Sequence, residues 1–165
     1  MKAALRLALA LVLLGLLYWL YTVLFPSPEK AVLKRIASLA ATATIPAGTN
    51  PLLRANKVGT VIAYFSPDAE ITYDLVGVGA HTLSGRDEIR EAAAGGFAGA
   101  TSLSVRFQDL TVRLGPDKLS AEVSCTAKVS ANGDQDTGIQ EMRFQLRKLD
   151  GDWLITRAET VKTLQ

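Results

Sequence analysis

Two chemically versatile residue types are nearly absent from this sequence of 165 residues, which has one cysteine, Cys125, and one histidine, His81. A single cysteine excludes a disulfide within the chain, and a lone thiol in a strand-like pattern is most often a small buried apolar residue. Structural zinc sites take four ligands from His and Cys side chains, so we expect no metal site. The glycines match no phosphate-cradling motif and no Gly-x-Ser-x-Gly occurs, so we also expect no cofactor.

A basic surface is missing too, once the first 25 residues are set aside. Lys2 and Arg6 are the only charged residues there, which leaves 16 of the 18 basic residues and all 16 acidic residues for the rest of the chain. That remainder has a formal net charge of zero. Proteins that neutralise nucleic-acid phosphates carry a basic patch or stripe, so we expect no nucleic-acid partner.

A long apolar run without a charge, LALALVLLGLLYWLYTVLF, occupies residues 7–25. As a helix it would rise about 28 Å, close to the thickness of a bilayer's hydrocarbon core. Tyr18, Trp19 and Tyr21 stand near its end, where amphipathic rings favour the membrane interface. A cleaved signal peptide is the alternative, but it would have a shorter apolar core and a small-residue cleavage site. We therefore predict a transmembrane anchor over residues 1–25.

The flanks of this run bear on its orientation. Lys2 and Arg6 precede it, and the positive-inside rule keeps such a short tail in the cytoplasm, although Lys30, Lys34 and Arg35 follow the run at a distance. Residues 26–28 then form a short tether. On this reading the protein is single-pass and residues 29–165 form an exported domain, periplasmic if the source is Gram-negative.

The domain begins with a helical pattern. Apolar residues recur at helical spacing over residues 29–41, and residues 42–50 have the composition of a loop. Asn50 followed by Pro51 predicts the start of a second helix, which runs to about residue 65 and buries Leu52 along with later apolar residues. Residues 69–74 then predict a short strand. Ser84 with Asp87 fits a capping box for a third helix, which we expect to end at Gly95 and Gly96.

After about residue 100 the apolar period changes from helical to two. Alternation runs from Leu103 to Leu114, with a slip at Gln108-Asp109 that suggests a bulge. Three further runs lie around residues 119–129, 142–146 and 153–155, and turn signals at residues 115–117, 132–133 and 150–151 separate the four runs. The second half therefore predicts four consecutive antiparallel strands.

Helices followed by an antiparallel meander imply an α+β fold. A sheet that is apolar on one face has to be covered, so we expect a curved antiparallel sheet that wraps three helices and leaves a cone with a mouth at one end.

This order of elements, with three phrases of the sequence, resembles the nuclear transport factor 2-like superfamily, which includes ketosteroid isomerase and the SnoaL-like cyclases. The phrases are IAYFSPDAEITYD (62–74), LSGRDEIREA (83–92) and LDGDWLITRAE (149–159). In the superfamily, the first phrase ends a helix and forms the first strand, the second opens the helix that closes the pocket, and the third forms the last hairpin. The resemblance covers about residues 29–163.

The resemblance implies a role for Asp74. In ketosteroid isomerase the general base is an acid at the end of the first strand, followed shortly by a glycine, and Asp74 with Gly77 looks like that place. The cyclase branch uses an Asp–His pair for acid–base work, so His81 is its candidate partner. An exposed loop histidine and a carboxylate on the pocket rim are the alternatives without catalysis.

Five further residues are candidates for lining the pocket. Tyr64 and Tyr73 could stand in for the isomerase tyrosine, whose position falls at about Ile36 and is not conserved in type here. Glu141 lies near the place of the isomerase's second acid. Phe97 belongs to a set of aromatic residues that would fill the cone if no pocket exists. Arg157 either lines the pocket with Glu159 or forms an ion pair with it on the solvent face.

Three functions remain open from the sequence. The first is a non-catalytic module at a membrane surface that binds a small apolar ligand or a protein partner. The second is an isomerase, cyclase or hydratase that uses Asp74 as general base. The third is a scaffold subunit that forms a homodimer through its exposed sheet face. An enclosed apolar cavity in which Asp74 and His81 converge would favour the enzyme, whereas a filled cone would not.

Overall fold

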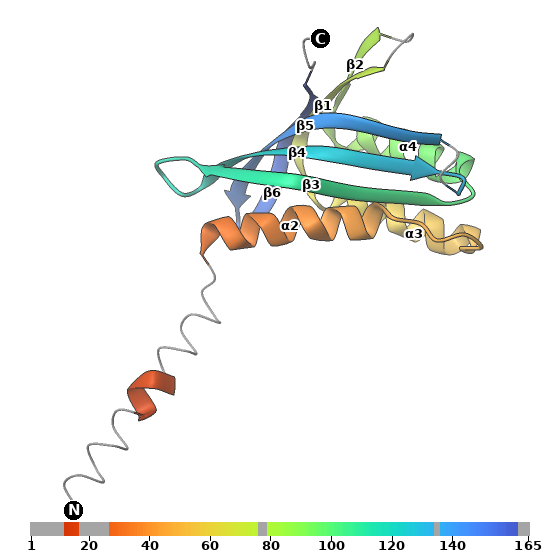
Figure 1. The fold of residues 1–165 in the computed structure, drawn as a ribbon. Helices are drawn as coiled ribbons and strands as arrows, with labels where there is room; N and C mark the ends of the chain where they lie inside the picture. The colour runs from red at the N-terminus through yellow and green to blue at the C-terminus, as the bar shows by residue number, and fades with distance from the viewer. Residues whose placement is uncertain (1–11, 17–26, 76–78, 134–135, 162–165) are drawn as a thin grey trace, which may run out of the picture.

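A computed structural model describes residues 12–16, 27–75, 79–133 and 136–161. Apart from a short helical stretch at residues 12–16, these residues form one domain (Figure 1), with the elements α2 (Pro28–Ala43), α3 (Pro51–Ile62), β1 (Phe65–Leu75), β2 (Gly79–Ser84), α4 (Gly85–Gly99), β3 (Leu103–Leu114), β4 (Ser120–Ala131), β5 (Asp136–Leu149) and β6 (Asp152–Thr160). Most of the predicted anchor, residues 7–25, lies outside the described residues. Within them, no helix has the length and apolar character needed to cross a membrane.

The six strands form a single sheet in the order β2-β1-β6-β5-β4-β3. The predicted four-strand meander is confirmed, because β3, β4, β5 and β6 pair antiparallel in sequence order. The prediction of a wholly antiparallel sheet is wrong, since β1 pairs parallel with β6. Parallel neighbours need a long connection, and here the rest of the domain supplies it. The pairing of β1 with β6 joins segments that are far apart in the chain, so no local sequence pattern predicts it.

Bulges and tight turns shape the meander. The register shifts between Gln108 and Thr111, and Asp109 has φ 54°, which confirms the predicted bulge. A second shift lies between Gln145 and Leu146, opposite β6. Asp150 and Gly151 have φ 51° and 93° and form the two-residue loop between β5 and β6, as expected of a type I′ hairpin turn. In Figure 1, β1, β2 and β6 cross the direction of β3–β5 steeply, so the sheet curls around its helices.

The helix starts follow their capping residues. Asn50 Oδ1 accepts a hydrogen bond from the Leu52 amide at 2.8 Å, and Pro51 takes the first position of α3. At α4 the predicted box is only partly correct, because the Ser84 hydroxyl makes no capping bond. The Glu88 carboxylate instead accepts from the Ser84 amide at 2.7 Å. Glu88 therefore does what the box assigns to Asp87, and Asp87 forms an ion pair with Arg90.

Several expectations about element ends, burial and structure type are wrong. Helix α3 ends at Ile62, before Phe65, which begins β1, and Leu52 is 69% exposed although burial was expected. Helix α4 continues through Gly95 and Gly96 to Gly99. Two glycines cost a helix roughly 1 kcal/mol each; the extra turn carries Phe97 into the core, where it is 6% exposed. The stretch around His81, expected to be a loop, is strand β2.

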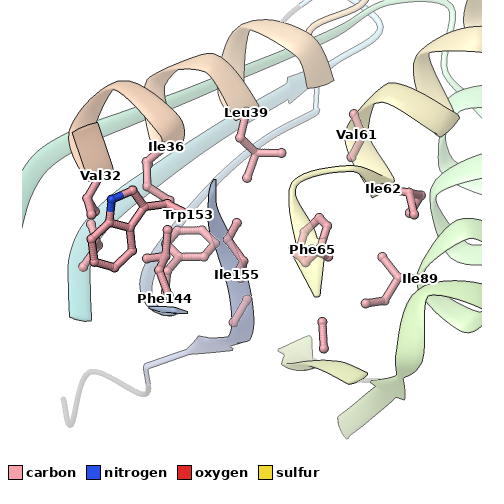
Figure 2. Packing of buried hydrophobic residues seen from close by; sticks show 14 of the residues in the cluster. Val32, Ile36, Leu39, Val61, Ile62, Phe65, Ile89, Phe144, Trp153 and Ile155 are labelled. Atoms are coloured by element: carbon pink, nitrogen blue, oxygen red, sulfur yellow. The ribbon is translucent and has the colours of Figure 1, made fainter. Parts of the chain in front are cut away.

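The core lies between the helices and one face of the sheet. Figure 2 shows Trp153 and Phe144 below Val32 and Ile36 of α2, with Ile155 beside them. A second group joins Ile62 of α3, Phe65 of β1 and Ile89 of α4. Phe107 meets Phe144 edge-on, with ring centroids 5.4 Å apart. The helix-side face of the sheet is thus packed with side chains, at about 25 cal/mol of stabilisation per Å² of apolar surface buried.

Candidate functional site

The end of β1 decides where Asp74 points. Successive side chains of a strand face opposite sides of the sheet. Ala69 is fully buried and Ile71 packs against the core, so Tyr73 is next on the helix side. Asp74 belongs to the alternate set with Glu70 and lies on the outer face, away from the helices. Its backbone amide donates to the Thr160 hydroxyl at 3.0 Å. The helix-side position at the end of β1 therefore holds a tyrosine.

His81 lies on the other face of the β1–β2 hairpin from Asp74. It is the direct cross-strand partner of Tyr73, and the two rings stack with centroids 5.8 Å apart. Asp74 is paired with Ala80 instead. The structure thus brings together His81 and Tyr73, and it separates the Asp74–His81 pair expected from the cyclase resemblance. The physical reason is that successive side chains of a strand alternate between the two faces of the sheet. His81 faces the same side as its partner Tyr73, which is the side opposite Asp74.

The interior of the cone is filled. Phe144 and Trp153 are each at most 6% exposed, and Phe107 is half-buried against Phe144, whereas Phe97, also 6% exposed, packs between α3 and α4. These are the residues whose burial distinguishes a packed cone from a pocket. In the part of the chain that the structure describes, the core between the helices and the sheet is packed with these side chains.

The candidate lining residues lie in different places. Tyr64 lines a surface cavity of about 300 Å³ between α2 and the β5–β6 turn, where the Arg35 guanidinium lies 4.2 Å from its ring centroid. Glu141 lines an outer-face cavity of about 230 Å³. Arg157 pairs with Glu70 at 3.2 Å. Tyr73 lies at the hairpin. Phe97, described next, lines a groove between helices, so these residues do not form a single site.

An apolar groove of about 280 Å³ lies between α3 and α4. The α3 side presents one helical stripe at positions i, i+3, i+4 and i+7, and α4 presents two alanines beside Phe97: the lining residues are Pro51, Arg54, Ala55, Val58, Ala94, Phe97 and Ala98. Sequence reasoning found Phe97 but missed the groove. Ala94 and Ala98, four residues apart on one helix face, were the signal, because their small side chains leave the space open.

Arg54 fixes the groove's rim. Its guanidinium donates to the Thr49 carbonyl at 3.0 Å and to the Thr101 carbonyl at 2.9 Å, and it also bonds the Ala100 carbonyl. These bonds tie the start of α3 to the end of α4. Because its donors are engaged with backbone carbonyls, Arg54 contributes mostly its alkyl stem to the lining.

The fold and these positions can be compared with known proteins. Residues 43–159 match the family model of the SnoaL-like domain. The chain belongs to the SnoaL-like domain family. A comparison with curated proteins found no match.

Several solved structures share the SnoaL-like, nuclear transport factor 2-like fold of this chain. One from Novosphingobium aromaticivorans, provisionally named an aromatic ring hydroxylase, has 18% identity and a TM-score of 0.64, covering 83% of this chain and 90% of that one. Another from the same species, provisionally named a scytalone dehydratase, has 16% identity and a TM-score of 0.60, covering 82% and 83%. A protein of unknown function from Pseudomonas putida KT2440 has 13% identity and a TM-score of 0.64, covering 83% and 87%. At these identities the likeness shows the fold.

The outer face of the SnoaL-like domain carries cross-strand ion pairs. Arg157 bonds Glu70 of β1, and Arg143 of β5 bonds Glu159 at 3.0 Å. Arg157 and Glu159 were expected to line a pocket or pair with each other, and each instead takes a partner on the next strand. Cross-strand neighbours lie about 5 Å apart at Cβ, closer than residues two apart along one strand. Half-exposed pairs such as these stabilise a fold by about 0–1 kcal/mol each.

The remaining chemical groups offer little reactivity. Cys125 is buried, as expected, and burial raises the pKa of its thiol to about 11. A nucleophilic cysteine would need the opposite shift. The described part of the chain holds no group of three His, Cys, Asp or Glu residues that could bind a metal ion.

Proposed function

We propose that this SnoaL-like domain is non-catalytic and binds a small apolar ligand in the groove between α3 and α4. The observation that carries the proposal is the contrast between two spaces. The cone is packed with aromatic side chains, whereas the groove is open and lined by Ala55, Val58, Ala94 and Phe97.

The groove's size and chemistry define the ligand. At about 280 Å³ it lies near the lower limit of the roughly 300–1,000 Å³ typical of small-molecule pockets. Its walls are aliphatic apart from Phe97, and the polar donors of Arg54 are already bonded to carbonyls. A compact apolar molecule, or one apolar ring of a larger one, fits this lining.

The alternative is an isomerase, cyclase or hydratase with Asp74 as general base. A general base has to be within hydrogen-bond reach of the proton it removes. Asp74 lies on the outer face of the sheet, and His81 lies on the helix side. The two side chains therefore do not meet in one enclosed apolar space. The names of the hydroxylase and dehydratase neighbours describe those proteins. The geometry therefore favours binding over catalysis.

We further propose that residues 7–25 hold the domain at a membrane. This rests on the charge-free run of the sequence and on the described part of it, where residues 12–16 are helical and Val12, Leu13, Leu14 and Leu16 are each more than half exposed. The test is extraction of cell membranes at high pH. Full-length protein should stay with the membranes, and a chain beginning at Ser27 should not; release of the full-length chain would refute the anchor.

The ligand proposal is tested by a thermal-stabilisation screen of small apolar compounds on the full chain in detergent. A ligand at 100 times its Kd stabilises by about 2.7 kcal/mol. Ala94→Leu fills the groove, so it should abolish the response to any hit. Ala92→Leu, exposed on the same helix outside the groove, should keep it.

Asp74→Asn separates the two functions. A groove ligand should bind this variant as it binds the wild type, because Asp74 is on the outer sheet face. Loss of binding in Asp74→Asn, with binding retained in Ala94→Leu, would overturn the proposal and favour the enzyme.

A further inference from the structure

One pair of like charges breaks the pairing rule of the outer sheet face. Arg106 of β3 and Lys128 of β4 are direct cross-strand partners. Like charges in this position repel and destabilise the sheet. The next residue in the same row, on β5, is Ile139, which is apolar and 67% exposed. The row therefore contains two cations and no acid.

Among the described residues, no ion pair with an acid offsets this pair of cations. The ion pairs of the described residues join Glu70, Glu122 and Glu159 to Arg157 and Arg143, and Asp87 to Arg90. Glu141 occupies the next row of β5, opposite Thr126, and forms no ion pair with Lys128 in that part of the chain. Positions that break a local rule are expected at functional or strained sites.

The two cations flank a small cavity. It has a volume of about 60 Å³ and is lined by Ser104, Arg106, Lys128 and Ser130. Ser104 and Ser130 are themselves cross-strand partners, one row from the cations, and Ser130 is 7% exposed. The volume corresponds to about two water molecules at roughly 30 Å³ each, which suits a single small ion.

We propose that this cavity binds a phosphate group, either as inorganic phosphate or as the head of a phosphate monoester. Arg and Lys supply the positive charge that phosphate recognition uses, and the Ser104 hydroxyl can donate from the adjacent row. The several N–H groups of Arg106 and Lys128, together with this hydroxyl, match the several oxygens of a tetrahedral anion better than the two oxygens of a carboxylate. The bound anion would also relieve the repulsion between Arg106 and Lys128.

The site lies away from the start of the domain. Ile45, just after α2, bridges Leu103 at the start of β3, and the Thr44 hydroxyl accepts a hydrogen bond from the Val105 amide at 3.1 Å. The cavity is thus near the C-terminal end of α2, whose 16 residues separate it by about 24 Å from Pro28. If residues 7–25 hold the domain at a membrane, the membrane lies nearer to Pro28 than to the cavity. We therefore infer that the phosphate comes from solution.

The test measures unfolding temperature of the full chain in detergent, with inorganic phosphate titrated against chloride at constant ionic strength and pH. Phosphate should raise the unfolding temperature of the wild type with a saturating dose dependence. Arg106→Gln and Lys128→Gln should each weaken the apparent affinity at least about tenfold, the loss expected for one charge-assisted contact.

Two comparisons make the result specific. Arg113→Gln removes a cation from the same strand, opposite Glu122 and outside the cavity, and should bind phosphate as the wild type does. In chloride alone, Lys128→Gln should be at least as stable as the wild type, because it removes the repulsion. A failure of Lys128→Gln to fold as well as the wild type would contradict the repulsion on which the proposal depends.

A second arm identifies the source of the phosphate. Short-chain phosphatidic acid replaces inorganic phosphate in the same detergent. A response to the lipid alone that both site variants abolish would keep the phosphate site and overturn its supply from solution. Equal temperature shifts in all four proteins would mean a general salt effect and would overturn the site.

Discussion

Replacing Phe144 by alanine probes the filled cone directly. Phe144 of β5 is 3% exposed and lies with Trp153 beneath α2 (Figure 2), with the Phe107 ring edge-on at 5.4 Å. Truncating a buried phenylalanine to alanine costs about 3–5 kcal/mol, and the lost aromatic pair contributes about 0.5–1.5 kcal/mol. We expect Phe144→Ala to lower the free energy of unfolding by about 4 kcal/mol. With a urea m-value of about 2 kcal/mol/M, the midpoint should fall by roughly 2 M.

The same variant should gain a binding property. A dry apolar cavity of this kind accepts benzene in another protein, so benzene should restore part of the stability of Phe144→Ala in urea unfolding followed by far-ultraviolet circular dichroism. Gln145→Ala is the matched control, because Gln145 is exposed on the outer face, and its unfolding free energy should change by no more than about 0.5 kcal/mol. A loss below about 1 kcal/mol in Phe144→Ala would refute the packed cone. Benzene should also stabilise the wild type less than it stabilises Phe144→Ala. Equal stabilisation of the two proteins would refute the packed cone, provided that Ala94→Leu, whose groove is filled, is stabilised equally as well.

Three further outcomes are expected. Gly151→Ala should destabilise the domain by roughly 1–2 kcal/mol, because φ 93° is strained for a residue with a Cβ. Gly138→Ala, at a position with ordinary φ and open space, should not destabilise it. Chemical denaturation measures both variants, and equal losses of stability would contradict the turn assignment. The Cys125 thiol, with its pKa raised to about 11 by burial, should react with a disulfide reagent at pH 8 only after denaturation, and fast labelling of the folded protein would disprove its burial. Hydrogen bonds from the Leu119 amide and from Ser120 lower the pKa of Asp117, so its carboxyl resonance should titrate below the ordinary value of about 3.8. Its contribution to stability is then present above that value and lost as the pH falls through the lowered pKa, and Asp117→Asn should remove this part of the acid dependence.

Local chemistry predicted much of the second half of the chain. The alternation in β3 and β4, the slip at Gln108-Asp109 and the Asp150-Gly151 turn each involve neighbours in the sequence, and each is confirmed. Helix starts were predictable for the same reason, since Asn50 acts on an amide two residues away. Less local choices failed. Whether Glu88 or Asp87 serves the Ser84 amide depends on side-chain reach, and α4 passes Gly95 because Phe97 packs in the core.

The candidate site was less predictable because it depends on which face a residue takes. The sequence by itself determined that residues 69–74 alternate, that four strands follow one another, and that the chain belongs among proteins with this fold. It could not determine the phase of that alternation, and a shift by one residue moves every side chain to the opposite face.

Only the tertiary structure decided that Ala69 and Ile71 face the core, which sends Tyr73 to the helix side and Asp74 to the outer face. It also decided the parallel pairing of β1 with β6, the filling of the cone and the groove between α3 and α4. Each of these is a contact between segments distant in the chain. The free energy of such a contact comes from burial and strand pairing that exist only in the folded chain. Residues that are neighbours in the sequence therefore do not predict it.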